Sequence, residues 1–292
     1  MKFGIIGNTD KVGLADAVEA LVQKLDASNV SYILDRDVFS LLEGKSKKSA
    51  AGRCTTVEEC VEGADILVAF GGDGTILNAV RAVGSRSTPI LGVNLGKLGF
   101  LAELAPDEIE AAIGDILKKQ YVIEERLVLE ASFPSDSGKQ IYALNDIVIG
   151  KSSYTTLIDL ETHIDGSFAV TYRADGLVLS TPTGSTAYAL SNGGPIVVPT
   201  SRVIGITPIA PHTLSGRPLI VPDESSIRVI AHANSDDVSF FADGQLAGSY
   251  RSPVEIRLKS ASFKARLIKR VDRSYFDVLR AKLMWGKDPR GV

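Results

Sequence analysis

Residues 71–75 read GGDGT and set one carboxylate among three glycines. The apolar run ADILVAF (64–70) stands before them, and a pattern typical of a helix follows. A glycine-rich turn between a buried strand and a helix can surround a phosphate with backbone N–H groups, and the helix dipole adds to the attraction. The stretch therefore predicts a phosphate site that contains Asp73. The simpler interpretation is a tight turn in which Asp73 only caps the helix.

This turn fits neither of two common nucleotide-binding fingerprints. The chain has no G-x4-G-K-[ST] spacing of a Walker A loop, and the third glycine of the dinucleotide fingerprint would fall on Leu77. A second glycine-containing loop, GVNLGKLGF (92–100), follows the next apolar run. If the two runs form neighbouring parallel strands, both loops open at the carboxyl edge of the sheet, where α/β proteins bind ligands.

A long polar motif, TPTGSTAY (181–188), stands in the second half of the chain. It offers three hydroxyl groups and a ring that could stack on a flat ligand: Thr183, Ser185, Thr186 and Tyr188. The segment LND (144–146) adds an amide and a carboxylate, the pair that hydrogen-bonds sugar hydroxyls and purine edges. Taken singly, each segment could also be an ordinary turn.

The elements that would position these motifs follow two different sequence patterns, one in each part of the chain. From residue 1 to about 120, apolar runs at 2–7, 31–35, 64–70 and 88–94 alternate with helical patterns at 13–27 and 106–120. This alternation predicts a parallel, doubly wound, Rossmann-like α/β domain. The polar stretch at 42–53 has no periodicity and is expected to be a mobile surface loop.

From residue 121 to 268 the chain reads as strands and hairpins, including an Asp-Gly turn at 165–166. This part predicts an all-β, β-sandwich-like domain. A last helical pattern at 273–285 is expected to return to the first domain and to present one apolar face, made of Phe276, Leu279, Leu283 and Met284. The predicted domains are therefore 1–120 with about 269–292, and 121–268.

The amino-acid composition limits which binding partners and which cellular compartment are expected. Of 292 residues, 45% are hydrophobic and 23% charged, as in globular proteins. A net charge of −3 and a pI near 5.7 favour neither a nucleic-acid nor an anionic-membrane partner. Two cysteines, Cys54 and Cys60, match no zinc spacing and are too few for a disulfide framework, so reduced thiols in the cytoplasm are expected. The N-terminal KFGIIG is too short for a signal peptide, and no apolar run approaches a bilayer span.

In this order along the chain, several segments resemble the motif series of the NAD kinases: GGDGT, NLGKLGFLAE, LND, DGLVLSTPTGSTAYALSNGGPI, ITPIAPHTLSGRPLIV and FADGQ. The similarity covers roughly residues 64–250, and the block at 175–195 is its most specific part. The resemblance implies transfer of the terminal phosphate of ATP, or of polyphosphate as an alternative donor, to the 2′-hydroxyl of the adenosine ribose of NAD, giving NADP. It also implies a homotetramer or homodimer.

Roles follow from the resemblance by motif. Asp73 would be the catalytic aspartate and would also contact NAD. The donor phosphates would lie against Gly71, Gly72, Gly74, Thr75 and Asn94. NAD would be bound by Gly74, Asn145, Asp146, Arg173, Asp175, Thr183, Thr186, Ala187, Tyr188, Ser191 and Gln245, the last one reaching in from a hairpin, from a neighbouring position in the oligomer. No dedicated metal cage is expected, so Mg2+ would arrive bound to the nucleotide.

Two other functions remain open at this point. GGDGT alone is shared with lipid kinases of the diacylglycerol and sphingosine type, although the chain lacks a membrane-facing basic or amphipathic segment. A non-catalytic dinucleotide sensor would keep the pocket but would not need a carboxylate in the phosphate turn. Neither alternative explains GGDGT and TPTGSTAY together.

Overall fold

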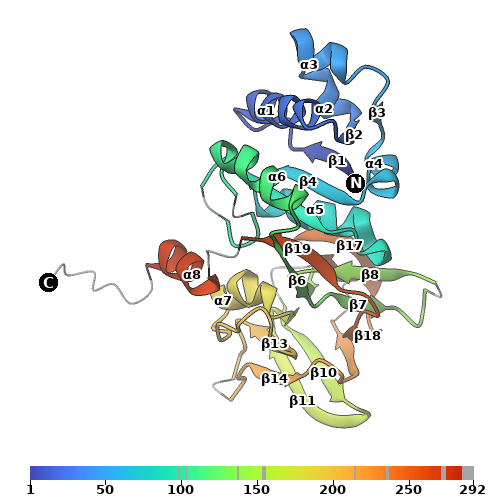
Figure 1. The fold of residues 1–292 in the computed structure, drawn as a ribbon. Coiled ribbons are helices and arrows are strands. Elements are labelled where there is room, and N and C mark those ends of the chain that lie inside the picture. Colours follow the sequence, from blue (N-terminus) through green and yellow to red (C-terminus); the bar gives the residue numbers. More distant parts are fainter. Residues whose placement is uncertain are drawn as a thin grey trace, which may run out of the picture. The chain divides into compact units, whose positions relative to one another are not determined.

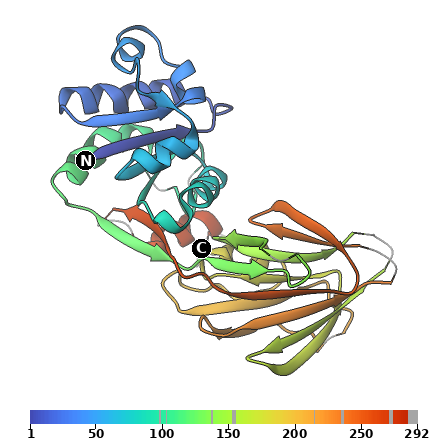
Figure 2. The ribbon, with the colours of Figure 1, turned by 90° about the vertical axis from the view of Figure 1, so that its right-hand side faces the viewer.

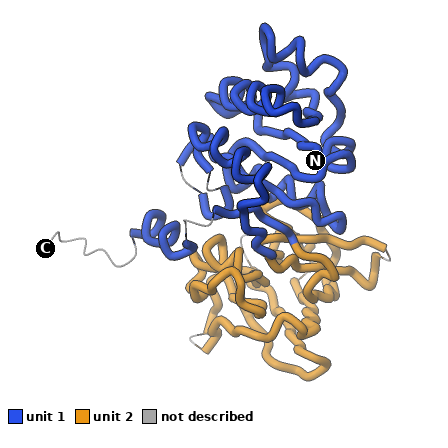
Figure 3. The backbone as a smooth tube through the Cα atoms, in the orientation of Figure 1, with its two compact units in different colours: residues 1–125, 265–292 blue, residues 126–264 orange. Residues whose placement is uncertain are grey.

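The computed structural model describes residues 1–97, 99–102, 104–136, 138–152, 156–213, 215–234, 237–270 and 274–284. Leu98 and Glu103, which belong to the NLGKLGFLAE motif, lie outside these ranges. The chain forms two compact units (Figure 3): unit 1 comprises residues 1–125 and 265–292, and unit 2 comprises residues 126–264. The sequence placed the same divisions at residues 120 and 268.

Unit 1 is built on a seven-stranded sheet (Figure 1) with the order β3-β2-β1-β4-β5-β19-β6. Its strands are β1 (Lys2–Gly7), β2 (Ser31–Asp35), β3 (Cys54–Thr55), β4 (Ile66–Gly71), β5 (Ile90–Asn94), β6 (Val122–Arg126) and β19 (Ala265–Lys269). The neighbours from β3 to β19 pair in parallel. The strand order reverses between β1 and β4, and in open α/β sheets that reversal marks the ligand-binding edge. The turn GGDGT follows β4, at this reversal.

Helices cover both faces of this sheet, as the alternating pattern predicts. They are α1 (Leu14–Ala27), α2 (Arg36–Ser40), α3 (Gly44–Ser49), α4 (Val57–Gly63), α5 (Asp73–Val83) and α6 (Ile109–Leu117), with short 3-10 turns at Gly84–Arg86 and Pro106–Glu108. Helix α8 (Tyr275–Leu283) also belongs to unit 1. Helices α1 and α6 contact each other on one face, and α4 and α5 contact each other on the other. Apolar side chains at helical spacing on α1, such as Leu14, Val18 and Leu21, are fully buried in this core.

Unit 2 consists of two antiparallel six-stranded sheets (Figure 2), with the orders β11-β10-β15-β18-β7-β8 and β14-β13-β12-β9-β16-β17. The first contains β7 (Leu129–Ser132), β8 (Gln140–Ala143), β10 (Ile158–Ile164), β11 (Ser167–Ala174), β15 (Ile227–His232) and β18 (Val254–Ser260). The second contains β9 (Asp146–Lys151), β12 (Gly176–Ser180), β13 (Val203–Ile209), β14 (Leu219–Pro222), β16 (Asp237–Ala242) and β17 (Gln245–Arg251). Inward-facing residues of both sheets share one apolar core, which makes unit 2 a β-sandwich.

Two local expectations were wrong. The stretch at 42–53 is not only a loop, because α3 forms within it and buries Ser46. On α8 the buried side chains are Val278 and Leu279, whereas Phe276, Leu283 and Met284 are 44%, 38% and 64% exposed. The motif TPTGSTAY forms a 3-10 turn, η3 (Thr183–Thr186), and then enters a short helix, α7 (Tyr188–Ser191).

Candidate active site

The carboxylate of Asp73 is held by backbone groups from a distant part of unit 1. Strand β4 ends at Gly71, and Asp73 is the first residue of α5. Its Oδ2 accepts the N–H of Phe100 at 2.9 Å, and its Oδ1 accepts the N–H groups of Leu101 and Ala102 at 3.0 and 3.3 Å. The N-cap of α5 is Gly72, which makes no side-chain cap. Asp73 therefore fastens the loop after β5, and helix capping is not its role.

The loop after β5 is also closed by its own polar groups. The side chain of Asn94 donates to the carbonyl of Gly96 and accepts the N–H of Gly96, at 3.3 and 3.2 Å. The N–H of Leu95 donates to the carbonyl of Gly71 at 2.9 Å. Gly71 and Asn94 are register partners at the ends of β4 and β5. The two glycine loops therefore meet at one edge of the sheet, as expected.

The fold requires a glycine at some positions of GGDGT and not at others. At Gly71 an added Cβ would lie 2.8 Å from the Thr75 Cβ, so the turn itself needs a glycine there. At Gly72 and Gly74 an added Cβ would meet no atom within 4 Å, and neither residue has a positive φ. The fold does not require glycine at these two positions. They leave an open backbone surface at the N-terminus of α5, where anions are favoured.

In unit 2, three motifs that lie far apart in the sequence meet around residues 144–146. The carboxylate of Asp243 accepts the N–H groups of Leu144, Asn145 and Asp146, at 3.0, 2.7 and 3.3 Å. The hydroxyl of Thr181 donates to the carbonyl of Leu144 at 2.5 Å. The structure thus joins LND, the start of TPTGSTAY and the Asp-Gly turn of FADGQ into one cluster.

Close backbone packing completes this cluster. The N–H of Thr181 donates to the carbonyl of Asn145 at 2.9 Å. A Cβ on Gly184 would overlap the same carbonyl, so only glycine lets the 181–184 turn lie this close to Asn145. The polar side chains around this point are consequently placed by packed backbone on both sides.

Asp146 is a buried carboxyl, only 4% exposed, at the start of β9. Burial raises its pKa to about 7, and the nearby charge of Asp243 adds to the rise. The backbone N–H of Tyr188 donates to this carboxyl and partly opposes the rise in pKa. Asp146 therefore changes its charge near neutral pH, close to the exposed ring of Tyr188.

We expect Asp146 to make folding stability fall as the pH rises toward neutrality. Because its folded-state pKa, about 7, lies above the ordinary aspartate pKa of 3.8, its contribution to stability is complete below pH 3.8 and is lost as the pH rises through about 7. The loss is at most about 4 kcal/mol. Urea unfolding of the wild type and of Asp146→Asn, from about pH 5 to about pH 8, measures it. The variant should show a flatter profile, and equal slopes would contradict the assignment.

The residues predicted within TPTGSTAY separate into two groups. The hydroxyls of Thr183 and Ser185 are buried: Thr183 accepts from Arg126 Nη1 at 3.2 Å, and Ser185 donates to the carbonyl of Pro182 at 2.6 Å. They stabilise the turn. The ring of Tyr188 is 46% exposed, and Thr186, Ala187 and Ser191 also reach the surface in part. Thr186, Ala187 and Tyr188 in the motif, and Ser191 just after it, are the residues that a ligand could touch.

The structure places the remaining predicted residues unevenly. Gln245 follows the Asp243 turn in the same chain and pairs with Ala242, so it lies beside the cluster. Arg173 and Asp175 do not lie beside the cluster. Asp175 directly precedes β12, whereas Ser180, the register partner of Asp146, is at the other end of that strand. The carboxylate of Asp175 pairs with Lys151 at 2.5 Å. Arg173 pairs with Asp159 at 4.0 Å.

Several residues that build the site have no role in the sequence-based prediction. Asp243 stands in FADGQ, where the predicted site residue is Gln245. Thr181 and Gly99 lie inside motifs, but Thr181 bonds to the distant carbonyl of Leu144, and Gly99 lies against the carboxylate of Asp73. Arg126 is 3% exposed and reaches Thr183 from outside every motif. The sequence feature that could have pointed to Asp243 is its Asp-Gly pair, which is typical of a tight hairpin turn; in the structure Asp243 has a left-handed φ of 49°.

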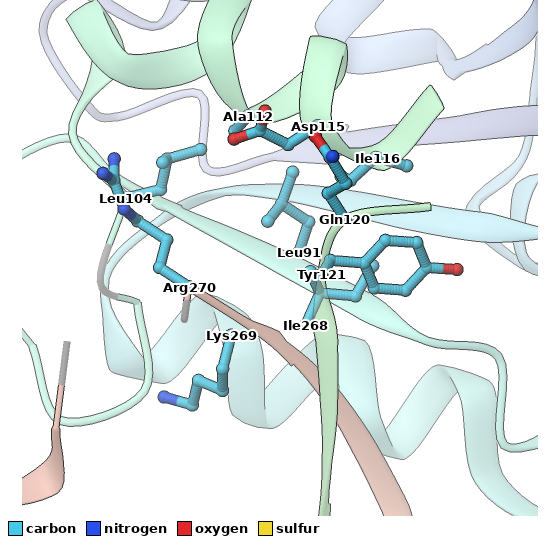
Figure 4. Close-up of a pocket in the computed structure, with 10 residues that line it drawn as sticks. All are labelled: Leu91, Leu104, Ala112, Asp115, Ile116, Gln120, Tyr121, Ile268, Lys269 and Arg270. Atoms are coloured by element: carbon cyan, nitrogen blue, oxygen red, sulfur yellow. The ribbon is translucent and has the colours of Figure 1, made fainter. Parts of the chain in front are cut away.

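A separate cavity of about 270 Å³ lies in unit 1 (Figure 4), between α6 and strands β5 and β19. Its floor is aliphatic, and Arg270 at its edge donates to Glu108 at 3.0 Å. No predicted site residue lines it. The residues around it are Leu91, Leu104, Ala112, Asp115, Ile116, Gln120, Tyr121, Ile268, Lys269 and Arg270.

Among the described residues, no three His, Cys, Asp or Glu side chains are grouped so that they could hold a metal ion. No helix in the described part of the chain is long and apolar enough to cross a bilayer.

Two family models match this chain: the ATP-NAD kinase N-terminal domain over residues 3–121, and the ATP-NAD kinase C-terminal domain over residues 144–270. The chain belongs to the NAD kinase family. The NAD kinase of Bacteroides fragilis is 37% identical over 291 residues, covering 99% of this chain and 100% of the relative. That of Geotalea daltonii is 41% identical over 263 residues, covering 88% and 92%.

Solved structures agree with the NAD kinase assignment. Yeast NADH kinase, crystallised with NADH, has a TM-score of 0.89 at 28% identity and covers 99% of this chain and 89% of its own. An NAD kinase from Archaeoglobus fulgidus, in complex with ATP, has a TM-score of 0.76 at 27% identity and covers 96% and 99%. The resemblance and the fold class are confirmed. NAD kinases are phosphotransferases, and the lipid-kinase and sensor alternatives have no support among these matches.

Proposed function

We propose that this chain transfers the terminal phosphate of ATP to the 2′-hydroxyl of the adenosine ribose of NAD. The observation that carries the proposal is a fixed carboxylate, Asp73, beside the open backbone of Gly72 and Gly74 at a helix N-terminus. Such an arrangement can hold phosphates and an attacking hydroxyl together, and phosphoryl transfer depends mainly on positioning and charge neutralisation. Relatives named NAD kinase, and similar structures solved with NADH and with ATP, support both substrates.

Unit 1 would bind the donor. The phosphates would lie against Gly71, Gly72, Gly74 and Thr75 at the start of α5, with Asn94 holding the facing loop in shape. Because no metal cage was found among the described residues, Mg2+ would arrive with the nucleotide and offset its charge.

Unit 2 would bind the dinucleotide through the cluster at 144–146. Asn145 and Asp146 would receive ribose hydroxyls, while Thr186, Ala187, Tyr188 and Ser191 would line the pocket with their exposed parts. Thr183 would act indirectly, through its buried bond to Arg126. Gln245 would close one side, next to the Asp243 turn.

The chemical step would use the carboxylate of Asp73. Its Oδ2 would accept the proton of the ribose 2′-hydroxyl while the hydroxyl oxygen forms a bond to the γ-phosphorus. The bond from that phosphorus to the β,γ-bridging oxygen breaks, and ADP leaves with the bonding electrons.

The test is incubation of the purified chain with NAD and Mg-ATP, scored for NADP. A panel that replaces ATP with polyphosphate, and NAD with NADH, identifies the donor and the acceptor. Turnover of a diacylglycerol or sphingosine substrate without NADP formation would overturn the proposal.

We expect Tyr188→Ala to weaken NAD binding more than it slows the transfer. A ring that stacks on a base contributes equally to ground state and transition state, so its loss raises KM and leaves kcat nearly unchanged. The ring is 46% exposed, so its removal should leave no core cavity. Steady-state kinetics with varied NAD measure the effect. A large fall in kcat at constant KM would give Tyr188 another role.

We also expect self-association. Arg173 and Asp175 stand at the far end of β12 from the 144–146 cluster, and in the proposed site they would contact NAD held by a second copy of the chain. Apolar side chains on β14 and β17 are exposed, among them Ile220 at 39% and Leu246 at 64%. Light scattering should show a dimer or tetramer. A monomer of 31.1 kDa would remove Arg173 and Asp175 from the proposed site.

The cytoplasm fits the two thiols best. Cys54 and Cys60 are both free, and burial raises the pKa of the Cys60 thiol to about 12, so it stays protonated.

A further inference from the structure

Three successive backbone N–H groups, from Phe100 to Ala102, converge on the carboxylate of Asp73. An ionised carboxylate has about four lone-pair positions, two on each oxygen. Two of the three donors point to Oδ1, which leaves that oxygen filled. Among the described residues, Oδ2 accepts from Phe100 alone and keeps one position open. The two oxygens of Asp73 are therefore not equivalent.

The held segment is fixed from its other side by β5. Leu104 bridges Val93 in parallel, and the N–H of Asn94 donates to the carbonyl of Leu104 at 2.7 Å. An added Cβ on Gly92 would lie 3.1 Å from the Ala102 Cα, so the segment packs tightly on the strand. Asp73 is its attachment on the opposite side, toward α5.

Gly99 makes this attachment possible. A Cβ at this position would overlap the carboxylate of Asp73, with Oδ1 as its nearest atom. Gly99 has no positive φ, so backbone strain does not explain the glycine. Only the approach of the Asp73 side chain does.

We infer that the two oxygens of Asp73 divide two tasks: Oδ1 clamps residues 101–102, and Oδ2, which also accepts the N–H of Phe100, receives the reacting hydroxyl at its open position. Gly99 is then a positioning residue, which acts through Asp73 and not on substrate. The inference rests on the proposed kinase reaction for the task of Oδ2, whereas the clamp is a property of the free protein. A carboxylate held by three backbone donors presents the open position of Oδ2 at a fixed angle, and small misplacements of reacting groups slow catalysis strongly.

The test compares Gly99→Ala with Gly96→Ala. Gly96 lies in the same loop, but a Cβ there meets no atom within 4 Å, and its φ is not positive. Gly99→Ala keeps the carboxylate and should lower kcat about a hundredfold with the KM for NAD within about twofold. Hydrogen exchange at the amides of 100–102 should become faster. Gly96→Ala should match the wild type in both measurements.

Asp73→Ala is the second variant, because it opens the clamp without inserting a group. Its amides at 100–102 should lose protection, while those of β4 keep it. Unchanged protection in Asp73→Ala, or wild-type kcat in Gly99→Ala with protection lost, would overturn the inference. Wild-type protein that makes no NADP would instead overturn the proposed function, and the exchange data would still decide whether the clamp exists.

Discussion

Asp73→Asn should reduce NADP formation by at least about a hundredfold, since the loss of a general base costs on the order of 10²–10⁴ in rate. Asparagine cannot take the proton of the 2′-hydroxyl. It also cannot satisfy the three backbone donors at 100–102, because one of its two polar atoms is an NH2 group and donates. The chemical step and the loop geometry should therefore fail together.

Binding of NAD separates this result from unfolding. The cluster around residues 144–146 contains no atom of Asp73, so calorimetric affinity for NAD should stay within a few-fold of the wild type. Comparison with Gly99→Ala then divides the rate loss, because that variant disturbs the clamp and keeps the base. A near-normal rate for Asp73→Asn would defeat the catalytic assignment.

Asp243→Asn should be the second severe variant and should act on binding. The Asp243 carboxylate accepts three N–H groups from 144–146, and each hydrogen bond to a charged group contributes roughly 1.5–3 kcal/mol. Asparagine tolerates the left-handed φ of 49°, so the turn itself should survive. We expect a loss of about 2–4 kcal/mol in unfolding free energy. The Kd for NAD should rise about a hundredfold, because Asn145 and Asp146 lose their fixed positions.

Asp165→Asn is the matched control for this variant. Asp165 also opens an Asp-Gly hairpin turn, with a φ of 51°, and its carboxylate accepts the N–H of Ser226 at 2.8 Å. The change should lower stability and leave NAD affinity unaltered. Calorimetry and urea unfolding on both variants check the pair. Equal NAD affinity in the two would show that the 144–146 segment does not bind the dinucleotide.

The sequence predicted the architecture well because its patterns are local. Buried parallel strands such as β4 read as continuous apolar runs, and α1 shows helical spacing along one face. The Asp-Gly pair at 165–166 marked the hairpin of β10 and β11 through its preference for positive φ.

Elements without such a pattern were missed. Helix α3 has the sequence GKSKKS, with no apolar residue that could show a period. The exposure of Phe276 and Leu283 on α8 depends on what the helix packs against, and composition does not encode that. The same holds for Ser185, whose hydroxyl looks available in the sequence but bonds to the carbonyl of Pro182.

The candidate site was predictable in its motifs and not in its contacts. Asp73 was found from its place in a glycine turn, whereas its partners are main-chain amides whose positions leave no mark on residue type. Asp243 is separated from Leu144 by 99 positions, and its role again depends on backbone donors. The chemistry of a side chain can be predicted from the sequence, but the main-chain N–H groups that hydrogen-bond to it cannot.

The discontinuity of unit 1 bears on how the protein is made. Strand β19 lies between β5 and β6 in the sheet, yet it is separated from both by all of unit 2. During synthesis the whole of unit 2 therefore leaves the ribosome before β19 does, and until then the edges of β5 and β6 that pair with β19 have no partner. Unpaired strand edges of this kind invite wrong partners. The nascent chain should depend on chaperone protection until β19 emerges, and messages truncated before residue 265 should yield aggregating product even though they encode all the proposed site residues.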